Sequence, residues 1–159
     1  MDSAPERRYG RLHGAKRRQT IVLSNRKEIH VEWGDCDPAG IVYFPRFFEY
    51  FDACTNALFE RAGFGKAEML KQYGLVGIPL VEASAQFYAP AWFGETVTVE
   101  TRIVEWGKSS FQVEHRLYKG GVLGAEGREK RVWAVPDAQS VKGMRGSAIP
   151  EEVKTRFEK

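Results

Sequence analysis

The segment from Pro45 to about residue 62 most constrains the fold, because a helix over these residues is apolar on more than one side. One stripe repeats at three- and four-residue spacing, the periodicity of a buried helix face: Phe47, Phe51, Cys54, Leu58 and Ala62. Further apolar residues lie outside that stripe: Phe48, Tyr50, Ala53, Ala57 and Phe59. Pro45 suits the first turn, where its missing N–H has no partner to lose, and Gly63 is typical of a helix end. Such a helix belongs in the middle of a fold.

Most of the remaining chain alternates apolar and polar residues, the pattern of strands with one buried face. The ranges 29–33, 78–88, 95–106, 111–118 and a stretch ending near residue 135 fit this pattern, with short helices expected at 66–73 and after residue 150. A turn at Lys119-Gly120-Gly121 joins two strands, and tight turns favour antiparallel order over helical crossovers. The chain therefore predicts an α+β fold, in which a curved antiparallel sheet of about five strands wraps around one long helix.

Length and composition indicate one domain. The chain has 159 residues, 43% of them hydrophobic, which suffices for a single core. Residues 1–27 differ, because they hold eight Lys or Arg against two acidic residues, whereas the remainder holds sixteen against nineteen. We interpret residues 1–27 as a basic, disordered arm that precedes a single domain over residues 28–159. Nucleic-acid binding is not expected, since no aromatic stacking pattern or recognition helix accompanies the charge.

Several chemistries and locations are not expected. Cys36 and Cys54 are too few for a disulfide framework, and without an apolar leader the protein is predicted to be cytoplasmic. The sequence contains no run of about 18 apolar residues, so no membrane-spanning segment is predicted. Lys108 follows a glycine in a strand turn and not at the start of a helix, unlike a phosphate-binding loop. The histidines and cysteines lack zinc-ligand spacing, so no metal or separate cofactor is expected, and His115 is interpreted as a satisfied core residue.

The loop between the first strand and the long helix holds the candidate chemistry. Asp35 and Asp37 lie two residues apart, Pro38 restricts the backbone and Gly40 permits a positive φ, so a shaped loop precedes the helix. The first N–H groups of a helix are unpaired and carry partial positive charge, which would polarise a carbonyl oxygen placed there. A carboxylate a few residues earlier would reach the same carbonyl carbon. The alternative interpretation is a turn with two solvated acids.

The residues from Val31 to Pro45, Val-Glu-Trp-Gly-Asp-Cys-Asp-Pro-Ala-Gly-Ile-Val-Tyr-Phe-Pro, closely resemble the 4-hydroxybenzoyl-CoA thioesterase family of hotdog-fold hydrolases. The similarity covers roughly residues 29–135 and continues through further segments: Phe51-Asp52-Ala53, Gly77-Ile78-Pro79, Val104-Glu105-Trp106 and Arg131-Val132-Trp133-Ala134. The run Asp-Cys-Asp-Pro-Ala-Gly-Ile-Val is highly specific for this branch, whereas Pro-Ala-Gly alone is shared with related acyl-CoA thioesterases. The resemblance implies a reaction of water with acyl-CoA to give a carboxylate and free coenzyme A, which is part of the substrate.

The resemblance also implies roles for particular residues. Asp37 would be the catalytic carboxylate, either attacking the thioester carbonyl to give an acyl-enzyme anhydride or activating water as a general base. The amide of Phe44 would polarise the thioester oxygen, and Tyr43 and Pro45 would help to fix its position. Asp52 matches a position near the acyl group, with a structural acid or a subunit contact as the alternative.

Basic residues are candidates for binding the phosphates of coenzyme A. Lys108 falls in a strand turn where the family keeps basic residues, and Arg128 and Arg131 are further candidates, each with a solvated charge as its alternative. A single hotdog unit leaves one sheet edge uncovered, and edge pairing between two copies is the usual remedy. We therefore expect a homo-oligomer, a dimer at least and more specifically a tetramer, with the site at the subunit interface.

Two departures from the family pattern bear on the acyl group. Phe44 lies where the 4-hydroxybenzoyl enzymes tend to have tyrosine, and Ile78 replaces a polar residue, so two partners for a phenol hydroxyl are missing. We expect a thioesterase for an aromatic (4-hydroxybenzoyl- or benzoyl-like) or medium apolar acyl-CoA, with a weakened preference for a para-hydroxyl. The alternatives are a thioesterase for straight-chain acyl-CoA or acyl carrier protein, and a non-catalytic acyl-CoA-binding module.

Overall fold

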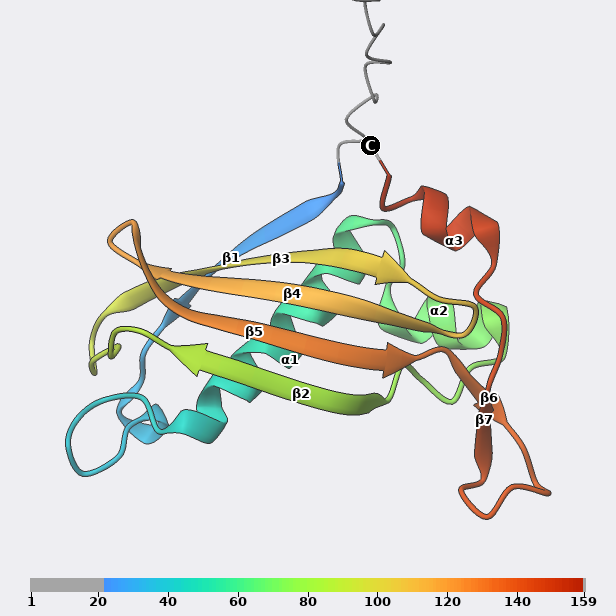
Figure 1. Cartoon of the computed structure of the whole chain (residues 1–159), viewed down its shortest axis with the longest axis horizontal. Coiled ribbons are helices and arrows are strands. Elements are labelled where there is room, and N and C mark those ends of the chain that lie inside the picture. Colours follow the sequence, from blue (N-terminus) through green and yellow to red (C-terminus); the bar gives the residue numbers. More distant parts are fainter. Residues whose placement is uncertain (1–21, 159) are drawn as a thin grey trace, which may run out of the picture.

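The computed structural model describes residues 22–158, which form a curved antiparallel sheet with a long helix against it (Figure 1). The helix, α1, runs from Phe44 to Arg61. The strands of the sheet are β1 (Ser24–His30), β2 (Leu80–Phe87), β3 (Thr96–Trp106), β4 (Ser110–Lys119) and β5 (Val122–Val132). Their order is β1-β3-β4-β5-β2, and every pairing is antiparallel. The predicted α+β fold is thereby confirmed.

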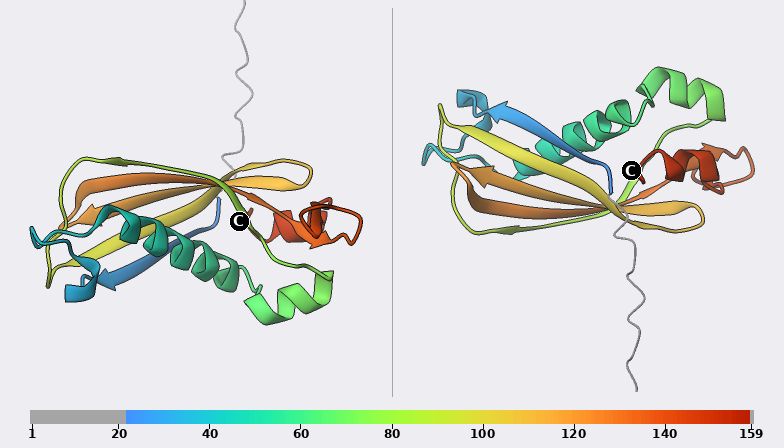
Figure 2. Two further views of the ribbon diagram at one scale, coloured as in Figure 1. Left: turned by 90° about the horizontal axis from the view of Figure 1, so that it is seen from below. Right: turned by 90° about the horizontal axis from the view of Figure 1, so that it is seen from above.

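Smaller elements complete the described chain. A short 3₁₀ helix, η1 (Trp33–Asp35), precedes α1, and α2 (Lys66–Tyr73) follows it. After β5 come a two-stranded ribbon of β6 (Ala134–Pro136) and β7 (Met144–Gly146), and then the helix α3 (Glu151–Thr155). Figure 2 shows α1 on one face of the sheet, with α2 and α3 toward the end where α1 finishes. No helix within residues 22–158 is long and apolar enough to cross a membrane.

The first strand lies earlier than the sequence predicted. β1 ends at His30, and the 3₁₀ helix begins soon afterwards because the Asp35 carboxylate accepts the Glu32 N–H at 3.0 Å. Residues 24–27, which the sequence assigned to the basic arm, pair with β3, where Lys27 lies opposite Val99. An edge strand tolerates charged side chains because they reach solvent. Leu23, also assigned to the arm, is buried, and its N–H donates to the Phe157 carbonyl at 2.8 Å. The predicted arm is therefore wrong for residues 22–27, and residues 1–21 lie outside the described residues.

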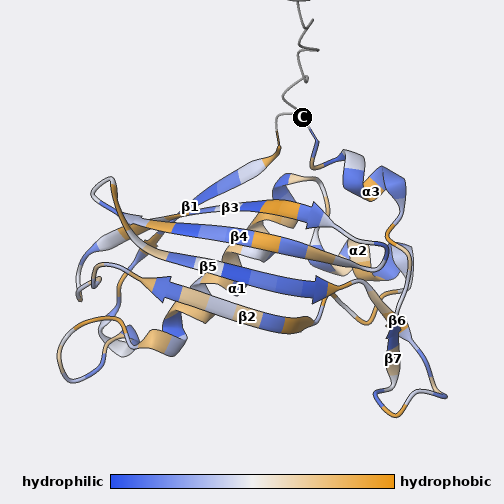
Figure 3. Ribbon diagram, viewed as in Figure 1, coloured by the Kyte–Doolittle hydropathy of each residue, from blue (hydrophilic) through white to orange (hydrophobic). Residues whose placement is uncertain are grey.

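The core lies between α1 and the sheet. Alternate residues of β3, such as Val97, point inward and are buried. One buried cluster surrounds Phe51 in the first half of α1, and a second surrounds Trp133 near the end of α1. Figure 3 shows both hydrophobic and hydrophilic residues along α1, and a hydrophilic end of β5, where the buried positions carry Glu129 and Arg131. The layer between helix and sheet therefore contains charged groups as well as apolar ones.

α1 approaches β5 closely at Gly127. A Cβ atom added to Gly127 would lie under 3.0 Å from three carbons of the Phe51 ring. The same ring stacks on His115, with the two ring centroids 4.7 Å apart. Glycine at this position therefore lets Phe51 and His115 pack in one layer, which fixes where α1 lies along the sheet.

Candidate active site

The loop between η1 and α1 is shaped by backbone hydrogen bonds. The Asp37 N–H donates to the Ile41 carbonyl at 2.9 Å, and the Gly40 N–H donates to the Asp37 carbonyl at 2.9 Å. Gly40 has a φ of 81°, a conformation that glycine adopts without strain. The Tyr43 N–H donates to the Asp35 carbonyl at 2.8 Å, which ties the loop to the start of α1. Asp37 and the helix terminus therefore keep a fixed relative position.

The carboxylate of Asp37 is partly exposed beside the helix terminus. Its Oδ1 accepts the Ala39 N–H at 2.8 Å, the hydrogen bond of an Asx turn, which restricts the side chain. No hydrogen bond from residues 22–158 reaches Oδ2. One oxygen is thus held in place while the other is available to a water molecule or a substrate.

The N-terminus of α1 presents an unpaired N–H group. Phe44 is the first helical residue, Tyr43 caps the helix without a side-chain hydrogen bond, and the first turn contains no acidic residue. Pro45 has no N–H, and the Arg46 N–H donates to the Tyr43 carbonyl at 2.9 Å. Among the described residues, nothing accepts a hydrogen bond from the Phe44 N–H. An unpaired N–H at this helix end carries partial positive charge and suits a developing oxyanion.

Asp37 and Phe44 line the same cavity, which has a volume of about 430 Å³ and lies at the N-terminal end of α1. Asp37 is the one charged residue among those lining it, and the rest is mainly apolar and aromatic, including Tyr43, Phe47 and Phe87. An apolar cavity with a few converging polar groups is the usual form of a small-molecule site. The structure therefore brings Asp37, Tyr43 and Phe44 together, with Pro45 beside them in the first turn.

The thiol of Cys36 is not activated as a nucleophile. Burial, together with the adjacent carboxylates of Asp35 and Asp37, raises the pKa of the Cys36 thiol. The thiol therefore stays protonated at neutral pH, and a protonated thiol is a poor nucleophile.

Asp52 lies about two turns further along α1 and outside this cavity. Its side chain is 55% exposed, and its Oδ1 accepts a charged hydrogen bond from Arg131 Nη2 at 2.6 Å. The Asn56 side-chain amide donates to the Asp52 backbone carbonyl at 3.0 Å and contacts Oδ2 at 3.3 Å. Within one chain, Asp52 is a surface acid held by a buried arginine.

Arg131 does not fit the phosphate-binding role that the sequence predicted. Its side chain is only 5% exposed. Nε and Nη2 donate to the two carboxylate oxygens of Glu129 at 2.8 and 3.1 Å, and Nη1 donates to the Ile78 carbonyl at 3.3 Å. The alternation of β5 turns residue 131 inward, where carboxylates and a carbonyl already occupy its donors. Ile78 likewise lies in the core cluster near the end of α1 and does not line the cavity of Asp37.

The partners of Arg131 form a buried polar network that the sequence analysis missed. The Thr55 hydroxyl donates to Glu129 at 2.8 Å, and a ring nitrogen of His115 lies 3.4 Å from the same carboxylate. The other ring nitrogen shares a hydrogen bond with Thr101 at 2.9 Å, so the prediction of a satisfied core histidine is confirmed. Burial would raise the pKa of Glu129, but contacts with His115 and Arg131 lower it to about 2. The sequence signal that could have revealed this network is the presence of two charged residues, Glu129 and Arg131, two positions apart on the same face of a strand.

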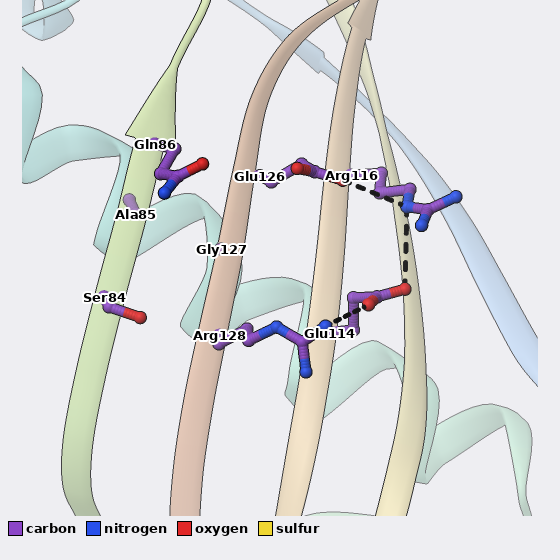
Figure 4. A pocket seen from close by; sticks show the side chains of 8 residues that line it. All are labelled: Ser84, Ala85, Gln86, Glu114, Arg116, Glu126, Gly127 and Arg128. Carbon is purple, nitrogen blue, oxygen red and sulfur yellow. Dashed lines mark hydrogen bonds and ion pairs between the residues drawn. The ribbon is translucent and has the colours of Figure 1, made fainter.

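Arg128 lies on the face of the sheet that points away from α1 (Figure 4). Its guanidinium lies 2.9 Å from the carboxylate of Glu114, which Arg102 and Arg116 also approach, at 2.7 and 3.5 Å. Lys108 is exposed in the turn between β3 and β4, at the opposite end of the sheet from the start of α1 (Figure 1). Within one chain, neither residue lies beside the cavity of Asp37. Across residues 22–158, no three His, Cys, Asp or Glu side chains gather as a metal site requires.

A curved antiparallel sheet wrapped around one long helix is the architecture of the hotdog fold, and here Asp37 and the first residue of that helix line one cavity. The chain belongs to the thioesterase-like superfamily, whose family profile matches residues 31–157. The resemblance to the 4-hydroxybenzoyl-CoA thioesterase family is confirmed, and so is the predicted enzyme class, an acyl-CoA thioester hydrolase.

Three relatives illustrate the similarity. The 4-hydroxybenzoyl-CoA thioesterase of Pseudomonas sp. strain CBS-3 is 35% identical over 122 residues, which is 72% of this chain and 85% of that protein. The solved structure of that enzyme has a TM-score of 0.77 at 31% identity and covers 84% of this chain and 99% of its own. A gentisyl-coenzyme A thioesterase structure has a TM-score of 0.71 at 34% identity, covering 84% and 98%. A 1,4-dihydroxy-2-naphthoyl-CoA hydrolase of Synechococcus elongatus is 26% identical over 87 residues, 55% of this chain and 64% of that protein.

Proposed function

We propose that this chain hydrolyses aromatic acyl-CoA thioesters, of the benzoyl or 4-hydroxybenzoyl type, in the cavity at the start of α1. The observation that carries the proposal is that Asp37 and Phe44 line one mainly apolar cavity of about 430 Å³. Oδ2 of Asp37 accepts no hydrogen bond from the described residues, and the Phe44 N–H donates none to them.

In the reaction, the Phe44 N–H donates a hydrogen bond to the thioester oxygen, which polarises the carbonyl group. In one route Asp37 attacks that carbon, the C–S bond breaks, and water then hydrolyses the acyl–aspartyl anhydride to the free acid. In the other route Asp37 takes a proton from a water that attacks the carbon, and the C–S bond breaks directly. In both routes coenzyme A leaves as the thiolate and takes up a proton that the water supplies.

The lining of the cavity favours an aromatic acyl group over a straight chain. Tyr43, Phe44, Phe47, Phe87 and Tyr88 all contribute aromatic rings to it. Aromatic rings pack well against one another in offset or edge arrangements. Relatives named for hydroxybenzoyl, gentisyl and dihydroxynaphthoyl thioesters support the same choice.

Self-association through β2 completes the proposed site. β2 is an edge strand, and its apolar residues Leu80, Val81 and Phe87 are exposed, whereas the opposite edge strand β1 carries Arg26 and Lys27. Charged edges resist pairing and apolar edges invite it. Because Phe87 also lines the cavity, a second copy paired along β2 would cover that side of the site. We propose a homo-oligomer, a dimer at least, in which the exposed Lys108 serves the phosphates of coenzyme A.

The test is a panel of thioesters assayed by released thiol. Benzoyl-CoA and 4-hydroxybenzoyl-CoA should be hydrolysed at comparable rates and faster than straight-chain acyl-CoA or acyl carrier protein thioesters. A preference for the para-hydroxyl above about a hundredfold, or ~2.7 kcal/mol, would contradict the expected weak recognition of that group. A wild-type protein that binds these thioesters without releasing thiol would instead be an acyl-CoA-binding module.

Asp37→Asn separates chemistry from loop structure. Asparagine keeps an Oδ1 that accepts the Ala39 N–H, so the loop should hold its shape while the carboxylate is lost. We expect kcat to fall by at least ~10³, about 4 kcal/mol, with substrate binding retained. Asp137→Asn is the matched control, because Asp137 Oδ1 accepts the Gln139 N–H at 3.0 Å in the same kind of turn, in the β6–β7 ribbon. Retained hydrolysis in Asp37→Asn would reject the assignment.

A further inference from the structure

We propose that Tyr50 is a positioning residue for the loop that carries Asp37. Its buried hydroxyl donates to the Asp35 carboxylate when a thioester is bound, and this contact fixes Asp37 relative to the Phe44 N–H. The inference rests on the proposed thioesterase function and adds two residues to it. Neither Tyr50 nor Asp35 lines the cavity, so both act through the two groups that do.

The hydroxyl of Tyr50 is an exception to ordinary hydrogen bonding. Tyr50 is only 8% exposed, yet its hydroxyl oxygen has no hydrogen-bond partner among residues 22–158. Buried polar groups are nearly always paired, because an unpaired one has given up its hydrogen bonds to water without replacing them. The ring packs edge-on against Phe47, a residue of the cavity wall, with the ring centroids 6.2 Å apart. A buried, unpaired donor beside the site indicates a partner that it meets during the reaction.

Tyr50 lies on the side of α1 that faces the Asp35 carboxylate. Arg46 and Tyr50 are four residues apart and are therefore neighbours on one side of the helix. Nε of Arg46 lies 3.9 Å from Asp35 Oδ1, which places this side of the helix against the loop. Burial, and after it the nearby Asp35 carboxylate, raise the pKa of Tyr50, so the hydroxyl keeps its proton and is able to donate.

The Asp35 carboxylate has room for a further donor. Its Oδ2 accepts the Glu32 N–H at 3.0 Å, whereas the 3.9 Å between Oδ1 and Arg46 Nε exceeds a hydrogen bond. The Asp35 side chain is 18% exposed, so few water molecules compete for Oδ1. A hydrogen bond from a hydroxyl to a carboxylate is short and strong. Hydrogen bonds at active sites often shorten only when the substrate is bound, which is the step we assign to this one.

Asp35 is connected through the backbone to both groups that act on the thioester. Its carbonyl accepts the Tyr43 N–H at 2.8 Å, and the next residue along the chain is Phe44, whose N–H is unpaired. Asp37 follows Asp35 by two positions. A shift of Asp35 therefore moves the carboxylate and the helix terminus relative to each other. Because the reaction needs both at one carbonyl group, such a shift lowers the rate of the chemical step more than the affinity for substrate.

A purely structural role for the hydroxyl predicts a different result of its removal. Phenylalanine keeps the ring of Tyr50, and loss of an unpaired buried oxygen should leave the free energy of unfolding unchanged or higher. If the hydroxyl has no part in the reaction, kcat stays unchanged as well. If it positions the loop, kcat falls in a protein that is no less stable than the wild type.

Tyr50→Phe is the main test, with thiol release from benzoyl-CoA as the assay. We expect kcat to fall about tenfold while KM stays within about twofold, because Tyr50 lies outside the cavity. Urea unfolding should show no loss of stability. Tyr73→Phe is the matched control, because the Tyr73 hydroxyl also meets a carboxylate, that of Glu152 at 2.8 Å, but joins α2 to α3 away from the cavity. Its kcat should equal that of the wild type.

Asp35→Asn tests the partner of the hydroxyl. Asparagine still has an oxygen to accept the Glu32 N–H, so the start of η1 should be kept, but it lacks the charge that strengthens a hydrogen bond from Tyr50. We expect kcat to fall about tenfold again, and the double variant to lie within about twofold of either single variant, since both changes remove one contact. Losses that multiply in the double variant would overturn the proposed pairing.

The remaining outcomes are equally decisive. Tyr50→Phe with the kcat of the wild type would overturn the proposal, and so would a raised KM at unchanged kcat. A variant that loses stability but keeps kcat would assign the hydroxyl to a structural partner such as a buried water, which also overturns it. Tyr50→Phe removes one oxygen atom, so it decides the question even where Asp35→Asn fails to fold. If the wild type releases no thiol, the proposed function fails and this inference with it; if the wild type is active and Tyr50→Phe matches it, this inference alone fails.

Discussion

Acid should destabilise this protein in a way that depends on Glu129. The pKa of Glu129 falls from an ordinary value of 4.5 to about 2 in the folded state, because contacts with His115 and Arg131 outweigh the effect of burial. The folded protein therefore keeps Glu129 ionised where the unfolded chain has taken up a proton. At 1.36 kcal/mol per pKa unit, the lowered pKa corresponds to about 3 kcal/mol of stability. This contribution is complete above about pH 4.5 and is lost as the pH falls toward 2.

Urea unfolding of the wild type and Glu129→Gln at pH 7, 5, 4 and 3 measures this contribution. Glutamine leaves Arg131 without its buried counter-charge, so the variant should be less stable at pH 7 by about 3 kcal/mol or more. Because glutamine does not titrate, the difference in the free energy of unfolding should shrink by about 2 kcal/mol between pH 7 and pH 3. Glu82→Gln, at an exposed position of β2, should follow the wild type at every pH. A difference between wild type and Glu129→Gln that stays constant from pH 7 to pH 3 would refute the reasoning.

Two further predictions concern packing and assembly. Gly127→Ala should lower the free energy of unfolding by about 1–3 kcal/mol in a denaturant titration, because its new methyl group overlaps the Phe51 ring; Gly34→Ala, with nothing within 4 Å of its added carbon, is the control, and equal costs for the two would contradict the packing argument. Val81→Lys should shift the protein from oligomer to monomer in sedimentation, because it places a charge on the apolar edge of β2, whereas Val122→Lys at the β4–β5 turn should not. A wild type that sediments as a monomer would exclude pairing through β2.

The close position of Asp37 to the start of α1 follows from the sequence because few residues separate them. A proline and a glycine restrict the loop, and Pro45 marks the first turn, so the carboxylate and the Phe44 N–H cannot lie far apart. The helix itself follows from its wide apolar surface, which also requires a sheet to cover it. The beginning of β1 was not predictable in this way, since its charged residues resemble those of the preceding arm.

The sequence by itself determined the long helix, most of the strands around it, and the closeness of Asp37 to the start of that helix, because each depends on local periodicity or on neighbours in the chain. Only the tertiary structure decided that Arg131 faces inward to Glu129, Asp52 and the Ile78 carbonyl, while Arg128, three residues earlier, faces solvent. Arg131 and Asp52 lie 79 positions apart, and their contact exists only because α1 crosses the sheet at that point of β5. Arg131, which the sequence predicted to be a surface cation, is the centre of a buried ion network. The sequence could not show this, because burial and the positions of distant partners are not encoded in a local pattern.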